Sequence, residues 1–136
     1  MIDTYDMDTM LFRALNTADI IDIISGGIYK SDDRPADSEL EDICINTIDV
    51  THEFTPQIGT SNVNIYTCDK ENNVKGKAVW QPDKAKLSEL TKAVMAKIKS
   101  TRIEGVKMYA THQTLLSEQS IHQHFTNIKV QWNIQI

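Results

Sequence analysis

Cysteine is scarce in this sequence of 136 residues, where only Cys44 and Cys68 occur. Two cysteines are too few for a disulfide scaffold, and their spacing does not match that of a structural metal site. Each lies in an apolar run of the kind that forms β-strands, so we predict two buried free thiols. Nothing in either run would lower the pKa of a thiol, and we therefore do not expect a cysteine nucleophile.

Long hydrophobic runs are absent as well. No apolar segment approaches the roughly 18 residues that cross a bilayer, and the acidic start Met1–Asp6 is unlike a signal peptide. We expect a protein that is intracellular when it is made and that has no contact with a membrane. The length and the ordinary apolar content of 40% predict a single globular domain over residues 1–136.

A basic excess is also missing, because the formal net charge is −5. This acidity argues against a dedicated nucleic-acid binder, which normally presents a basic patch. Residues 1–53 hold thirteen acidic and three basic side chains, whereas residues 54–136 hold six acidic and eleven basic ones. The two parts carry net charges of −10 and +5. Such polarity suits head-to-tail self-association, although solvated surface charge is an equally good reading of the same pattern.

Catalytic and cofactor motifs are lacking too. Gly26-Gly27 is not followed by the lysine and helix of a phosphate loop. An acidic run does not have the ordered Asp/Asn/Gly spacing of a calcium loop, and we interpret it as a solvated loop; its acids are Asp32, Asp33, Asp37, Glu39 and Glu41. We therefore predict no cofactor, no bound metal and no enzymatic activity.

Three histidines form the one group worth testing as a metal site: His112, His122 and His124. Zinc sites take three or four protein ligands, and a hairpin turning near residue 119 leaves His112 only diagonal to the other two. Ordinary strand histidines near a hairpin tip are the preferred interpretation. By strict alternation His122 and His124 share the face of Trp132, so we expect either a bulge near Phe125 or the end of the core there.

Apolar spacing predicts three helices, over residues 4–15, 18–24 and 82–100. Runs of β-branched or alternating residues predict four strands, over residues 42–48, 62–68, 106–117 and 121–136. Between them we expect an exposed, mobile loop at 31–41, a loop or irregular edge at 51–61, and a loop at 69–76. The fold class is therefore α+β in the order α-α-β-β-α-β-β. It would have an antiparallel or mixed sheet of about four to five strands and helices packed on one face.

The closing segment has the clearest pattern in the chain. Ile128, Val130, Trp132, Ile134 and Ile136 alternate with polar residues, which predicts a strand with one buried face, paired inside the sheet. The opposite face carries a single charge. We predict that it contacts another subunit or a partner protein, through residues that include Lys129, Gln131 and Asn133.

The N-terminal third has a recognisable order of short motifs at about residues 20–35: an Ile-rich helix after Asn16–Asp19, then Gly26-Gly27, Ile28-Tyr29 and Arg34-Pro35. In this order it resembles the tail-completion, or tail terminator, proteins of long-tailed bacteriophages. The remaining layout agrees in outline, including a lysine-rich helix and a closing strand led in by His-Gln-His-Phe. The acidic loop and residues 51–60 depart from the family pattern.

The resemblance implies a non-enzymatic virion subunit that assembles as a ring, typically a hexamer, and that can stay monomeric until it meets the tail. The ring would cap the tail tube and join it to the head-completion protein, first in the bacterial host cytoplasm and then in the virion tail. DNA would pass through without specific binding, and an acidic lining would keep its phosphates from sticking. We assign the five acids of the 31–41 loop to these contact and channel surfaces.

Three alternatives stay open. The first is a head–tail connector or neck protein, which has the same structural class. The second is a small metal-binding enzyme that uses His112, His122 and His124. The third is a regulatory or ligand-binding α+β domain with a pocket between the sheet and the long helix.

Overall fold

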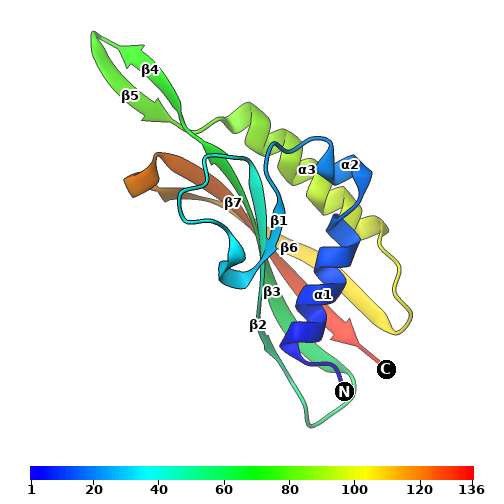
Figure 1. The fold of residues 1–136 in the computed structure, drawn as a ribbon. Coiled ribbons are helices and arrows are strands. Elements are labelled where there is room, and N and C mark those ends of the chain that lie inside the picture. Colours follow the sequence, from blue (N-terminus) through cyan, green and yellow to red (C-terminus); the bar gives the residue numbers. More distant parts are fainter.

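A computed structural model describes all residues, 1–136, and shows an α+β fold with helices on one face of a mixed five-stranded sheet (Figure 1). The helices are α1 (Thr4–Leu15), α2 (Ala18–Ile21) and α3 (Lys84–Ser100). The strands are β1 (Ile28–Lys30), β2 (Asp42–Val50), β3 (Gln57–Cys68), β4 (Lys70–Val74), β5 (Lys77–Gln81), β6 (Val106–Glu118) and β7 (Gln123–Ile134). The predicted fold class is confirmed.

The five strands of the main sheet lie in the order β1-β2-β3-β7-β6. Only β1 and β2 run parallel, and the other neighbours are antiparallel. The closing strand β7 is therefore a central strand, as the alternation predicted. Its inward residues from Ile128 to Ile134 are buried, but Ile136 lies beyond the strand and is 69% exposed, so its assignment to the buried face was wrong.

Helices α1 and α3 supply the second half of the core. Helix α1 starts with a capping box between Asp3 and Asp6 and buries Met7, Leu11 and Leu15 against the sheet. Helix α3 places a second stripe over β3, β7 and β6, formed by Leu87, Leu90, Val94 and Ile98. Helix α2 is shorter than predicted, because its i→i−4 hydrogen bonds end at Asp22 and the next two residues donate to carbonyls three residues back. None of the helices has the length and apolarity that a membrane span requires.

Strand β3 begins at Gln57, although residues 51–61 were predicted as a loop. Its first inward residues are polar or small, which hid the alternation: Gln57, Gly59 and Ser61. Each of the three makes its contacts with a distant part of the chain. The Gln57 side chain bonds the backbone of Ile2, and a Cβ on Gly59 would lie 2.6 Å from the Met7 side chain of α1.

A second, two-stranded sheet stands where a loop was predicted at 69–76. Strands β4 and β5 form an antiparallel hairpin that projects from the body of the molecule (Figure 1). Lys75 and Gly76 at its turn both have positive φ angles, the combination that a tight hairpin turn requires. The hairpin buries almost none of its residues, so its sequence carries no apolar pattern that would predict a strand.

The core ends before the turn of the β6–β7 hairpin. This is one of the two outcomes expected near Phe125. The pairing of β7 with β3 has no irregularity there, so no bulge intervenes. A bulge lies instead in β6, between Ala110 and His112, and it exchanges the two faces of that strand. Beyond it every residue of β6 is exposed.

Candidate functional site

The topology converts the charge asymmetry of the sequence into two flanks of the molecule. The acid-rich first third forms α1, α2, β1, β2 and their loops, on one side of the sheet. Helix α3 brings its lysines to the β6 side of the sheet, where Arg102 and Lys107 also lie. Two of these lysines reach the acidic side, Lys97 to Asp19 at 2.6 Å and Lys86 to Glu41 at 3.9 Å. Strand β3 between them has no charged side chain. We call these sides the acidic flank and the basic flank.

The loop at 31–41 is anchored to the sheet, which corrects the expectation that it is mobile. The Arg34 guanidinium lies 2.8 Å from the Asp42 carboxylate and 2.9 Å from the Gln123 side-chain oxygen. It also stacks over the Tyr66 ring at 4.1 Å. Gln123 in turn donates to the carbonyl of Ser38. Because Asp42 is fully buried, this network ties the loop across β2, β3 and β7.

The five acids assigned to this loop do not share one environment. Four of them are exposed, as predicted: Asp32, Asp33, Asp37 and Glu39. Glu41 is half-buried, and its carboxylate accepts the backbone N–H of Ser25 at 3.1 Å. The exposed four are open to solvent, whereas Glu41 holds the segment after α2 against the loop.

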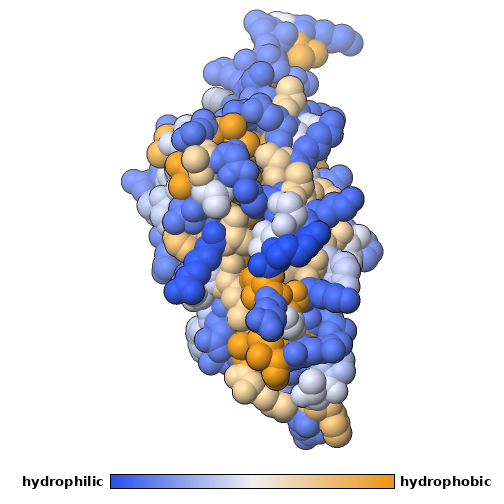
Figure 2. Space-filling model, turned by 90° about the vertical axis from the view of Figure 1, so that its right-hand side faces the viewer, coloured by the Kyte–Doolittle hydropathy of each residue, from blue (hydrophilic) through white to orange (hydrophobic).

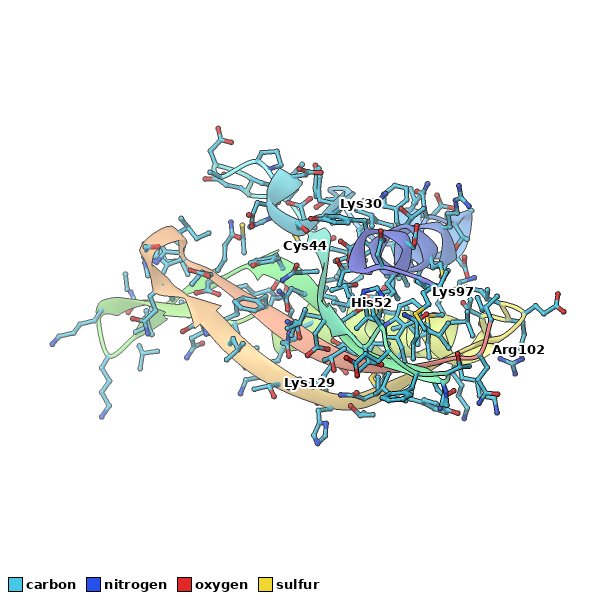
Figure 3. All side chains as sticks on the ribbon, turned by 90° about the horizontal axis from the view of Figure 1, so that it is seen from below. Lys30, Cys44, His52, Lys97, Arg102 and Lys129 are labelled. Atoms are coloured by element: carbon cyan, nitrogen blue, oxygen red, sulfur yellow. The ribbon has the colours of Figure 1, made fainter.

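The sheet face opposite the helices is polar and nearly uncharged, as predicted for the outer side of β7. Lys129, Gln131 and Asn133 lie there, and each is half-buried. They stand opposite Asn62, Thr60 and Ile58 of β3. Figure 3 shows Lys129 on this face, away from α1. We call it the outer face; apart from the anchored loop, which covers the β2 end, nothing in the chain packs on it.

The two edges of the main sheet differ in whether another strand could pair with them. Strand β6 pairs only with β7, so one edge of this 13-residue strand is free. At the opposite side β1 covers β2 only at residues 43–45. There the buried Asp8 of α1 accepts the backbone N–H of Thr47 at 2.8 Å and blocks further pairing. The open edge of β6, with Tyr109 and Leu115 exposed, is the one able to meet another chain.

A groove runs between the last turns of α3 and the start of β6, with a volume of about 830 Å³. Its apolar wall includes Met95, Ile103 and Met108. Its charged lining is entirely basic: Lys99, Arg102 and Lys107. In Figure 2, which faces the side at the right of Figure 1, a hydrophobic patch lies in the lower half and another at the upper left, and hydrophilic side chains surround both.

The three candidate histidines are not brought together. His112 pairs with Lys129 on the outer face, whereas His124 lies on the opposite face and its Nδ1 is 2.6 Å from the Asp69 carboxylate. His122 stacks on Trp80 at the base of the projecting hairpin, with the ring centroids 4.1 Å apart. No group of three or more His, Cys, Asp or Glu side chains has the arrangement of a metal site.

The two thiols also differ from each other. Cys44 is 7% exposed beneath the anchored loop, as predicted, but Cys68 is only half-buried. Burial raises the pKa of the Cys44 thiol to about 11. Burial also raises the pKa of Cys68, whose thiol donates to the Glu39 carbonyl at 3.0 Å. Neither group has the lowered pKa of a nucleophilic cysteine.

Alkylation of the native protein at pH 8 should therefore modify Cys68 well before Cys44. A pKa of about 11 leaves roughly 0.1% of Cys44 as thiolate at that pH, and burial further restricts access. Peptide mass spectrometry after timed exposure to iodoacetamide measures both rates. The unfolded protein in guanidinium is the control, where the two cysteines should react alike. Equal rates in the native protein would contradict this burial of Cys44.

No protein-family model matches this chain, and no curated protein matches its sequence. The proposed function therefore rests on the two flanks, the outer face, the free strand edge and the groove.

The sequence analysis missed the anchor between Arg34 and Asp42, although one signal was visible, since Arg34 is the single basic residue within the acidic loop. The groove lies where the ligand-binding alternative placed a pocket, between the sheet and the long helix. The residues that line it were not predicted, because they come together only where the end of α3 meets β6.

Proposed function

We propose that this protein is a non-enzymatic structural subunit that assembles head to tail with copies of itself. The observation that carries the proposal is the position of an acidic flank and a basic flank on opposite sides of the uncharged strand β3. Lys97 and Lys86 are partly used within the subunit, where they pair with Asp19 and Glu41, so Arg102, Lys99 and Lys107 are the bases left to meet another copy. Opposite charges on different sides of one molecule favour a heterologous contact, in which one surface meets a different surface of the next copy. Such contacts close into a ring when the rotation per subunit divides a full turn.

The free edge of β6 and the outer face support the same proposal. The edge of a 13-residue strand can pair with other chains if nothing covers it, and monomeric proteins normally protect such edges against this pairing. The outer face combines half-buried amides with a single lysine on β7, a composition suited to a second protein surface as well as to water.

Together with the resemblance in the N-terminal third, these surfaces favour a tail terminator. The proposed ring, a hexamer, caps the tube of a long-tailed phage and contacts the tail tube protein on one side and the head-completion protein on the other. Its place is the virion tail, after assembly in the bacterial host cytoplasm. The duplex passes through the ring without specific binding.

Self-association of the purified full chain should weaken steeply with salt. Between about 0.1 M and 1 M salt the screening length falls from roughly 10 Å to 3 Å, which removes attraction between exposed flanks. We expect the association constant to fall roughly tenfold or more, measured by sedimentation velocity. Association driven by apolar surface would persist or strengthen instead. That result, or the absence of association at low salt both alone and with tail tube protein added, would contradict the proposal.

Neutralising the exposed acids of the anchored loop should change DNA handling and leave assembly intact. The variant combines Asp32→Asn, Asp33→Asn, Asp37→Asn and Glu39→Gln, and it keeps Glu41 because that side chain bonds Ser25. With less repulsion of phosphates, the assembled protein should bind duplex DNA roughly tenfold more tightly in a gel-shift assay. Loss of assembly would place these residues in a subunit interface rather than along a channel.

A further inference from the structure

The end of β2 and its connection to β3 carry an exposed apolar and acidic tip. Phe54 in the connection is 74% exposed, and Ile48 in β2 is 53% exposed. Asp49 and Glu53 accompany them, and both are exposed. We call these four residues the loop tip. Nothing in its own subunit covers it.

The groove on the basic flank is apolar and basic, and it therefore complements the apolar and acidic loop tip. It has apolar walls, and the charged residues that line it are the three bases Lys99, Arg102 and Lys107. An aromatic side chain can fill the apolar part of the groove, while carboxylates beside it in the sequence can pair with the bases. The projecting hairpin does not fit, because its turn presents Lys75 and Lys77 and would meet like charge.

The loop tip cannot reach the groove of its own subunit. Both lie at the same end of the sheet, since Gln57, Ile134 and Val106 are in register across β3, β7 and β6. The tip belongs to the β2 side and the groove to the free edge of β6, so three strand spacings of about 4.8 Å separate them. The sheet itself keeps them apart.

We propose that the loop tip of one copy inserts into the groove of the next, with Phe54 as the apolar anchor and Glu53 and Asp49 facing Arg102 and its basic neighbours. This contact rests on the proposed head-to-tail assembly and assigns its two surfaces. It is heterologous, so every copy offers one tip and one groove. The chain of contacts continues until it closes on itself.

Two single-surface variants test this contact. Phe54→Ala removes the anchor and keeps the groove, whereas Arg102→Glu reverses the charge of one of the three bases in the groove and keeps the tip. Each alone should self-associate roughly thirtyfold more weakly than the unmodified chain, because central aromatic and arginine residues dominate such contacts. Mixed together, they should form a 1:1 heterodimer and nothing larger. Tyr5→Ala is the matched control, since Tyr5 is an equally exposed aromatic residue of the acidic flank and should leave association unchanged.

A titration followed by NMR gives an independent readout at high concentration. Isotope-labelled Phe54→Ala protein is mixed with unlabelled Arg102→Glu protein, and shifts are expected at the groove residues of α3 and β6. Absence of both the heterodimer and the shifts overturns the contact, as does unchanged self-association of either variant. In the latter case head-to-tail assembly stands and uses another surface. If the unmodified chain itself fails to associate at low salt, both alone and with tail tube protein added, the proposed function fails with it.

Discussion

Replacing Trp132 by alanine should lower the free energy of unfolding by about 3–5 kcal/mol, the usual cost of removing a large buried aromatic side chain. Trp132 is 1% exposed and packs in the core between the sheet and the helices. Its indole N–H also donates to the Ser61 hydroxyl at 2.9 Å, and Ser61 in turn bonds Thr47. One substitution thus opens a cavity and breaks a buried polar link across β2, β3 and β7.

Urea unfolding and a thermal scan measure the effect, and the melting temperature should fall by roughly 10–15 °C. Trp80→Ala is the matched control, because the same atoms are removed from a side chain that is 44% exposed on the projecting hairpin. It should cost less than about 1 kcal/mol. Similar losses from the two substitutions would contradict the location of the core.

Replacing Arg34 by methionine should cost about 3 kcal/mol, because it leaves the fully buried Asp42 carboxylate without its counter-charge. The loss should lie at the low end of the range for broken buried pairs. Asp42 keeps the hydrogen bonds from the Gly27 N–H and the Ser38 hydroxyl. Denaturant unfolding gives the free energy, and amide hydrogen exchange at Leu40 and Glu41 reports release of the loop.

Two further variants separate the effect of the Arg34–Asp42 ion pair from the effect of losing an arginine side chain. Adding Asp42→Asn to Arg34→Met should recover part of the loss, since no unpaired charge then stays buried. Arg102→Met changes an exposed arginine in the same way and should be nearly neutral. If Arg34→Met were as mild as Arg102→Met, the ion pair would not be what holds the loop.

The sequence predicted those elements whose buried residues are apolar. In β7 every inward position from Ile128 to Ile134 is apolar, and α1 and α3 each carry an uninterrupted apolar stripe. The start of β3 escaped prediction because its inward residues rely on other segments: Gln57 on Ile2, Gly59 on Met7. The projecting hairpin escaped it because a strand that buries nothing needs no apolar pattern.

The candidate surfaces were predictable in part. The charge asymmetry is visible in the sequence, but it becomes two flanks only because β7 returns beside β3 and places β6 at the far edge. The groove depends on the meeting of Met95 with Met108, residues on elements that are separate in the sequence. Contacts of this kind are set by packing in three dimensions, and no local pattern encodes them.

The number of copies in the assembled particle tests the central claim most directly. Native mass spectrometry of the full chain, sampled from about 10 μM to 1 mM protein at low ionic strength, counts the subunits in each species. A closed head-to-tail ring predicts one dominant multiple of the 15.4 kDa chain, six copies for the proposed hexamer, with no larger series. A monomer at every concentration, both alone and with tail tube protein added, or a dimer that grows no further, would contradict the account.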